Sequence, residues 1–95
     1  MAFKEVFSNE ANHDIDKIVS DASSTELAIQ FFDALEALLL LIKTYPKAFQ
    51  IKHEQVRIAV FPKLPFKLAY MIVQPDIIYI IAVIHQRQEA WKDRI

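Results

Sequence analysis

The chain has 95 residues, no cysteine and a formal net charge of −1, which predicts a single domain over residues 1–95 without disulfides or thiolate metal sites. A protein that holds nucleic acid mainly through its phosphates is usually basic, so this charge argues against broad electrostatic binding of DNA or RNA. The apolar runs ALEALLLLI and IIYIIAVI are shorter than the roughly 20 residues of a membrane span, and the N-terminal MAFKE lacks the features of a signal peptide. We therefore expect a cytoplasmic protein that does not enter a membrane.

The first two expected elements are a short strand and an amphipathic helix. Residues 3–7 (FKEVF) alternate between apolar and polar, which is typical of a strand. From Ser8, a good N-cap, the apolar period becomes that of a helix. The apolar stripe of this helix consists of Ala11, Ile15, Ile18, Val19 and Ala22. Asp14 lies off the stripe, where we expect it to be solvated.

A second helix follows after a short connection. Ser23 and Glu26 have the spacing of a capping box. The helix should run from Thr25 to about Thr44, because the residue before Pro46 disfavours helical torsions. The short connection between the two helices predicts an antiparallel hairpin.

The second helix is apolar around most of its circumference. Its expected core stripe consists of Phe31, Leu35, Leu38, Leu39 and Ile42. Leu40 and Leu41 extend apolar surface around the sides of the helix, so they are either further core residues or contacts with a dimer partner or another protein.

The rest of the chain favours strands. Residues 55–61 alternate, residues 66–73 are mostly apolar and residues 77–84 are continuously so. The connections at 62–65 and 74–76 are short and contain proline, which predicts an antiparallel meander. The expected fold class is therefore α+β, in the order β-α-α-β-β-β, with a helical hairpin packed on one face of a twisted antiparallel sheet.

The last two strands are apolar toward both faces of this sheet, whereas a helical hairpin covers one face. Either the chain's own tail or a partner must cover the second face. We expect a partner there.

Four segments, in this order, carry a family resemblance. Residues 6–19 (VFSNEANHDIDKIV) place an aromatic-Ser turn before an Ala-containing helix, YP at 45–46 ends the second helix, and VR follows at 56–57. Residues 64–91 begin with an apolar residue, a proline and an aromatic residue (LPF, 64–66). An alternating strand follows, and then an apolar strand that ends in Val-x-His (83–85). Over nearly its whole length the chain thus resembles the RelE/ParE toxin superfamily. Lys67 replaces that family's usual arginine and Gln88 replaces the second arginine of its terminal motif, so positive charge is reduced.

The resemblance implies the toxin of a bacterial type II toxin–antitoxin pair, a growth inhibitor associated with plasmid stabilisation and silenced by a cognate antitoxin. ParE-like members poison DNA gyrase without a recognised catalytic centre, whereas RelE-like members cut mRNA at the ribosome. Because the charge is low, we favour the ParE-like branch. The alternatives are a ribosome-dependent mRNA endoribonuclease and a non-toxic module that binds a partner. No cofactor or metal is expected, and the assembly is either a homodimer or a heterotetramer with the antitoxin.

A nuclease of this kind needs a base, an acid and cations around the reacting phosphate. The candidate catalytic residues, which apply if the chain is a nuclease, are His85, Arg87, Arg57 and Lys67. Strand parity places His85 on the same face as Tyr79, Ile81 and Val83. The alternative is structural, with His85 capping the sheet by hydrogen bonding and Arg87 paired with Glu89 or Asp93.

A second set of residues is suited to binding a protein partner. Its members are Tyr70, Tyr79, His85, Arg87, Trp91, Arg94, Leu40 and Leu41. Tyr70 is better suited to the core than to acting as an acid. Trp91 is better suited to folding back over the edge of the sheet or contacting a partner than to stacking on a base. Arg94 is otherwise a solvated charge of the tail.

Overall fold

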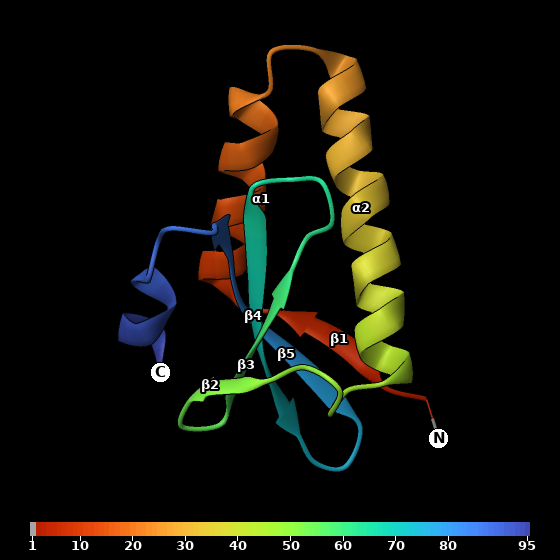
Figure 1. The fold of residues 1–95 in the computed structure, drawn as a ribbon, viewed down its shortest axis with the longest axis vertical. Coiled ribbons are helices and arrows are strands. Elements are labelled where there is room, and N and C mark those ends of the chain that lie inside the picture. The colour runs from red at the N-terminus through yellow and green to blue at the C-terminus, as the bar shows by residue number, and fades with distance from the viewer. Residues whose placement is uncertain (1) are drawn as a thin grey trace.

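A computed structural model describes residues 2–95, which form two helices packed on a five-stranded sheet (Figure 1). The elements in chain order are β1 (Lys4–Phe7), α1 (Asn9–Asp21), α2 (Thr25–Thr44), β2 (Ile51–His53), β3 (Val56–Val60), β4 (Phe66–Val73), β5 (Ile77–His85) and the 3₁₀ helix η1 (Ala90–Arg94). The α+β class and the helical hairpin on a sheet are confirmed. Of the helices in the described part of the chain, none is both long and apolar enough to span a membrane.

The sheet has the strand order β1-β5-β4-β3-β2. The predicted meander is present, since β3 pairs with β4 and β4 pairs with β5, both antiparallel. One pair differs from the expectation of an all-antiparallel sheet: β1 lies parallel to β5, with Lys4 opposite Ile77 and Phe7 opposite Ile80. The sheet is therefore mixed, and β5 is an inner strand, which explains why it is apolar toward both faces.

The short edge strand β2 was not predicted from the sequence. All three of its residues are exposed, so this strand has no buried face that would require alternating apolar residues in the sequence. It is joined to β3 by a tight turn in which Glu54 adopts a positive φ of 52°. Because the chain contains no glycine, an ordinary side chain occupies this conformation.

The helix boundaries follow local signals. The Ser8 hydroxyl accepts a 3.0 Å hydrogen bond from the backbone N–H of Ala11, as expected of the N-cap of α1. α2 begins at Thr25, as expected, but the expected capping serine is wrong: Ser24 rather than Ser23 is the N-cap and accepts from the N–H of Leu27 at 3.2 Å. α2 ends at Thr44, at the predicted stop before Pro46.

The main core lies between the helical hairpin and one face of the sheet. The predicted stripes of both helices contribute to it, and the whole predicted stripe of α2 is buried. Tyr70, Leu68 and Ile80 supply the sheet side of this core. The helix stripes and the inner strands were therefore readable from hydrophobic periodicity.

A second, smaller core lies on the opposite face of the sheet. It consists of Val56, Ala69, Ile81, Ala82, Ile84 and Trp91. The chain folds back after β5, and Trp91 of η1 is 2% exposed against the sheet. The expectation that a partner covers this face is thus wrong for the half under Trp91, which the chain's own tail covers. In the other half, the register partners Val6 and Tyr79 remain exposed.

A β-bulge in β5 determines which side chains share a face. The register with β4 shifts between Ala69 and Tyr70, so that Ala69 lies opposite Ala82 while Tyr70 lies opposite Ile80. Ile81 is the extra residue. An inserted residue reverses the alternation beyond it. The expectation that His85 shares a face with Tyr79 and Ile81 is therefore wrong. The His85 ring meets Phe66 on the helix side, whereas Ile81 lies in the second core and Tyr79 pairs with Met71 on that same side.

Candidate functional site

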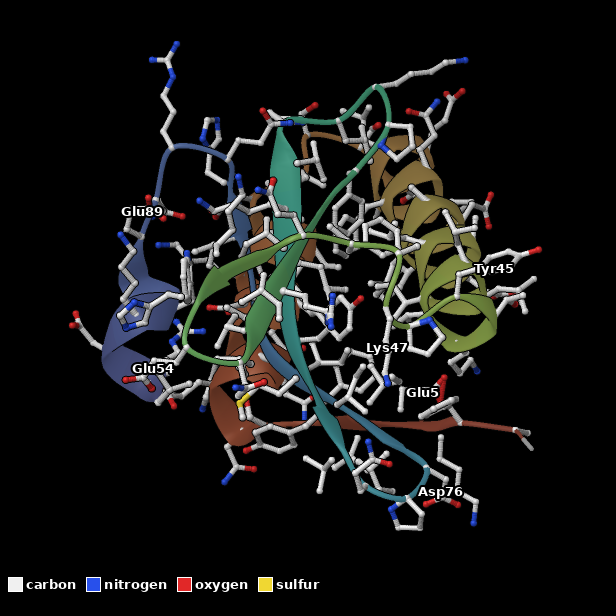
Figure 2. The ribbon with its side chains drawn as sticks, turned by 60° about the horizontal axis from the view of Figure 1, so that its bottom comes forward. Glu5, Tyr45, Lys47, Glu54, Asp76 and Glu89 are labelled. Carbon is white, nitrogen blue, oxygen red and sulfur yellow. The ribbon has the colours of Figure 1, made fainter. Side chains whose placement is uncertain are left out.

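The tail is attached to the second face of the sheet through Glu89. Its Oε2 accepts hydrogen bonds from Lys67 Nζ at 3.0 Å and from Trp91 Nε1 at 2.9 Å, and its Oε1 lies 3.8 Å from Lys92 Nζ. These contacts, the bond from Lys67 first, lower the pKa of the Glu89 carboxyl below its ordinary value. Glu89 lies at the side of the molecule occupied by η1 (Figure 2). Lys67, a predicted catalytic cation, is therefore a buried partner of the tail.

A second attachment joins the tail to α1. Arg94 donates two hydrogen bonds to Asp14, of 2.6 Å and 3.1 Å, and its Nε lies 3.4 Å from Glu10. The bonds to Asp14 raise the pKa of the Arg94 guanidinium. Both side chains are largely buried, with 15% of Arg94 and 14% of Asp14 exposed. The expectations that Asp14 and Arg94 are solvated are therefore wrong.

Asp14 and Arg94 also complete the free edge of β5. The four-residue strand β1 pairs with only the first part of the nine-residue β5. Beyond it, Asp14 Oδ2 accepts the N–H of Val83 at 3.0 Å, and the Ile81 carbonyl accepts from Arg94 and from the Ser8 hydroxyl, each at 3.2 Å. Side chains thus satisfy backbone groups that would otherwise lack partners.

Arg57 lies on the helix side of the sheet, where it organises the loop after α2. Its Nη1 donates to the carbonyls of Phe49, at 2.6 Å, and Lys47, at 3.2 Å. Beside it, the Tyr70 hydroxyl donates to the Pro46 carbonyl at 2.6 Å. Burial raises the pKa of Tyr70 to about 12, although nearby Arg57 opposes this shift. Arg57 and Tyr70 thus hold the loop that follows α2, whose first residues include Tyr45 and Lys47, labelled in Figure 2.

His85 and Arg87 lie at the end of β5, where both are exposed. The Nδ1 atom of His85 accepts a 3.2 Å hydrogen bond from the backbone N–H of Arg87, and the His85 N–H donates to the Gln88 side chain at 3.1 Å. This is the strand-end capping role considered for His85. The ion pairs of Glu89 are with Lys67 and Lys92 rather than with Arg87.

The structure does not bring the four candidate catalytic residues together. Arg57 lies opposite Tyr70 on the helix side of the sheet, whereas Lys67 lines a small pocket with Glu89 on the other side. His85 and Arg87 share the end of β5 but the other two cations are bound elsewhere. The end of β5 therefore presents an exposed histidine, His85, close to one exposed arginine, Arg87. The four side chains do not converge on a common site that could bind a phosphate. In residues 2–95, no group of three His, Asp or Glu side chains is placed to hold a metal ion.

The candidate partner-binding residues divide into buried and exposed ones. Tyr70 and Trp91 are core residues, and Arg94 is held by Asp14. The exposed members are Tyr79, His85, Arg87, Leu40 and Leu41.

Two features of the structure were not read from the sequence. Ile29 and Phe32 are exposed on α2, and their apolar character was the available signal. Asp14 stands three residues after Ala11 and four before Ile18, which places it beside the buried stripe of α1. That position could have indicated a half-buried carboxylate, but its partner near the C-terminal end could not be read from local spacing.

One comparison with known proteins identifies a family for most of the chain. The model of a family described as the ParE toxin of type II toxin–antitoxin system, parDE, matches residues 6–90. The match begins within β1 and ends at the first residue of η1, so it spans both helices and the four following strands. A search of curated proteins finds no match.

Proposed function

The chain belongs to the ParE toxin family of type II toxin–antitoxin systems, and from this premise we propose that it arrests bacterial growth by binding DNA gyrase. Membership of the family implies an antitoxin partner. We assign the neutralisation of this chain to a cognate antitoxin that covers exposed residues of the toxin. Because gyrase acts on the chromosome, the proposal places the protein in the bacterial cytoplasm.

One observation carries the choice of a binding mechanism over a catalytic one: Arg57 and Lys67 lie on opposite faces of the sheet, and each is already bound within the chain. Cleavage of RNA requires a base, an acid and cations within hydrogen-bond reach of one phosphate. With two of its cations engaged elsewhere, the end of β5 is better suited to contacting a protein surface. His85 and Arg87 are the residues we assign to the gyrase contact.

Expression of the gene without its antitoxin in a bacterial host tests the proposal. We expect filamentation, loss of colony formation and trapped gyrase–DNA cleavage complexes. With purified components, the protein should inhibit DNA supercoiling by gyrase in a concentration-dependent manner. Arg87→Glu should weaken this inhibition because it reverses a charge at the tip, whereas Lys47→Glu, the same change at an exposed site away from the tip, should not.

A ribosome-dependent mRNA endoribonuclease is the second candidate, because His85 is exposed with Arg87 two residues away. Cleavage of transcripts on ribosomes, abolished by His85→Gln and retained by the matched control His13→Gln on α1, would replace the gyrase proposal. Normal growth on induction would instead favour the third reading, a member that binds its partner without toxicity.

A further inference from the structure

A pocket lies where the end of α1, the start of α2 and the connection between β3 and β4 meet. Its volume is about 300 Å³, and its lining comes from residues between 18 and 22, between 27 and 31, and between 64 and 66. Figure 1 shows the connection between β3 and β4 reaching up between the two helices. We call this cavity the hairpin pocket.

The inner part of the hairpin pocket is aromatic and aliphatic. Phe31 is 3% exposed, and its ring meets the ring of Phe66 edge-to-face, with 5.7 Å between the centroids. Ile18 packs against the same core, and the exposed side chain of Leu27 forms part of the rim. Aromatic rings favour further edge-to-face or offset contacts with an added ring. An apolar cavity of about 150 Å³ can hold benzene, so the hairpin pocket has room for one ring with a short chain.

The polar groups of the hairpin pocket give it one sign of charge. Of the described residues that line it, Asp21 is the only charged one, and Gln30 supplies the other hydrogen-bonding side chain. Within residues 2–95, no ion pair includes Asp21. Lys17, one turn earlier on α1, lines a neighbouring hollow that Asp21 also borders, and Lys63 lines another. The pocket therefore offers a carboxylate that lacks a cation from the chain.

The ends of the helices reinforce this negative charge. Asp21 is the last residue of α1, and the last turn of this helix contains no basic residue. Its carboxylate thus lies at the negative end of the helix dipole, where a cation is favoured. The start of α2 would oppose this effect, but Glu26 stands in its first turn and the Ser24 hydroxyl already accepts the N–H of Leu27. The mouth of the hairpin pocket should therefore attract a positive group.

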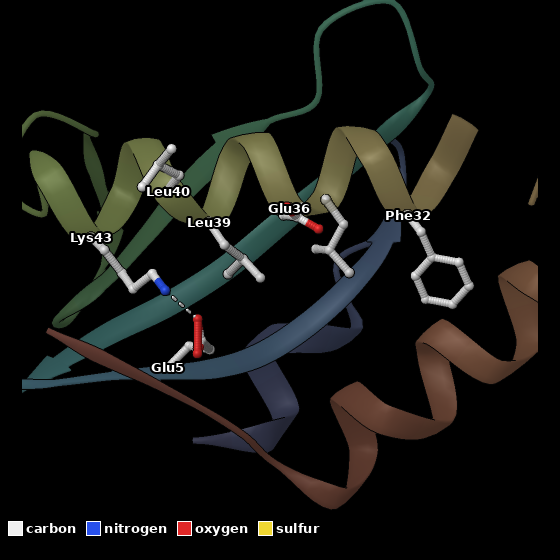
Figure 3. A pocket seen from close by; sticks show the side chains of 7 residues that line it. Glu5, Phe32, Glu36, Leu39, Leu40 and Lys43 are labelled. Atoms are coloured by element: carbon white, nitrogen blue, oxygen red, sulfur yellow. Dashed lines mark hydrogen bonds and ion pairs between the residues drawn. The ribbon is translucent and has the colours of Figure 1, made fainter. Parts of the chain in front are cut away.

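The larger hollow between α2 and β1 differs in this respect (Figure 3). Its lining carries Glu5, Glu36 and Lys43, and Lys43 is paired with Glu5 at 2.6 Å. Its charges are thus partly compensated within the chain. It supplies a control for the hairpin pocket, because Glu36 is an exposed helical carboxylate like Asp21.

Size and charge together select the occupant of the hairpin pocket. One turn of an α-helix, about 5.4 Å long and 10 Å across, would occupy more than 300 Å³. A small molecule fits this volume, which is at the lower limit of the range for ligand pockets, about 300–1,000 Å³. An anion would meet Asp21 without a compensating cation in the lining.

We propose that the hairpin pocket binds a small aromatic compound that carries an ammonium group. The aromatic ring packs on Phe31, Phe66 and Leu27, and the ammonium group lies at the mouth, where it donates to Asp21 and to the side-chain oxygen of Gln30. The inference goes beyond the proposed function and does not depend on gyrase being the target.

Three probes that share a phenyl ring on a two-carbon chain test this site on the full chain. They are 2-phenylethylamine, the neutral 2-phenylethanol and the anionic 3-phenylpropanoate. In a titration at pH 7 followed by the amide signals of the ¹⁵N-labelled protein, the largest shifts should fall in residues 18–31 and 64–66. The amine should bind about fivefold tighter than the alcohol, as for an exposed ion pair, and the carboxylate more weakly than both. Added salt should shrink these differences.

Two pairs of variants separate the charge from the cavity. Asp21→Asn should bring the amine and the alcohol to within about twofold of each other, whereas Glu36→Gln should retain the wild-type preference. Ala22→Leu places a larger side chain in the lining and should weaken binding of the amine by about tenfold or more. Ala37→Leu, at an exposed position of α2 outside this lining, should change it by less than about twofold. Circular dichroism confirms that each variant is folded.

Four results would overturn the proposal. They are no binding of the amine at millimolar concentration, equal binding of the amine and the alcohol, an unchanged preference in Asp21→Asn, and shifts centred outside residues 18–31 and 64–66. Growth arrest that persists together with any of these results would reject this inference and leave the proposed function standing.

Discussion

Asp14 in α1 and Arg94 in η1 lie eighty residues apart in sequence and are joined by two hydrogen bonds, of 2.6 Å and 3.1 Å. Asp14 also accepts the N–H of Val83, so one carboxylate connects the first helix, the last strand and the tail. The pair therefore holds the tail in the position in which Trp91 covers the second face of the sheet. Loss of this pair should loosen the tail before it unfolds the main core.

Arg94→Gln tests the contribution of this pair to stability. Removing the guanidinium leaves Asp14 largely buried without a charged partner, and we expect the free energy of unfolding to fall by about 1.5–3 kcal/mol, as for hydrogen bonds to charged groups. Urea denaturation measures the change. Lys92→Gln is the control, because its ion pair with Glu89 is exposed and long, and such pairs contribute about 0–1 kcal/mol. If both changes lowered the free energy of unfolding equally, the Arg94–Asp14 pair would contribute no more to stability than an exposed ion pair.

Trp91→Ala tests the tail as the cover of the second face. Truncating this buried side chain should lower the free energy of unfolding by about 3–5 kcal/mol and expose Ile81 and Ile84, so the folded variant should bind the dye ANS. Trp91→Phe should recover much of the loss because an aromatic ring refills the site. Tyr45→Ala removes an aromatic residue that is already exposed and should leave ANS binding at the wild-type level. An unchanged stability of Trp91→Ala would mean that the tail is detached in solution.

Acidification should release the tail through Glu89. Its folded-state pKa lies below the ordinary value of 4.5, so the stabilisation from its charged form is complete above pH 4.5 and is lost as pH falls through the lower pKa. Trp91 is the only tryptophan, so a red shift of its emission reports the release. The shift should precede loss of the far-ultraviolet circular dichroism signal, and Glu89→Gln should show it already at neutral pH. Coincident transitions at every pH would indicate that Glu89 plays no separate role.

Tyr70→Phe tests the attachment of the loop after α2. The variant loses the hydrogen bond to the Pro46 carbonyl, and we expect a loss of about 1 kcal/mol in the free energy of unfolding. The wild-type protein should also lose stability as pH rises from 10 toward 12, because unfolded tyrosine ionises near 10.0 while burial raises the pKa of Tyr70 to about 12. The slope of stability against pH in this range should be shallower in Tyr70→Phe. Tyr45→Phe, at an exposed site, should retain the wild-type slope.

Much of the fold was predictable because its signals are local. The stripe from Phe31 to Ile42 is the core face of α2, and residues 77–84 form an inner strand, since their apolar periods match those of a helix and of a doubly covered strand. The candidate site was less accessible. The candidate catalytic cations Arg57 and Lys67 are each hydrogen-bonded within the chain, on opposite faces of the sheet. Which face each one occupies follows from the strand register.

The two helices, the three main strands and the family resemblance could be read from the sequence, because hydrophobic periodicity, caps and ordered motifs depend on neighbouring residues. The parallel pairing of β1 with β5, the bulge at Ile81 and the contact of Asp14 with Arg94 are visible only in the folded chain. Each of these depends on groups that are distant in sequence, and a one-residue change of register moves a side chain to the other face of the sheet. For the same reason, only the folded chain showed that Trp91 covers the second face of the sheet.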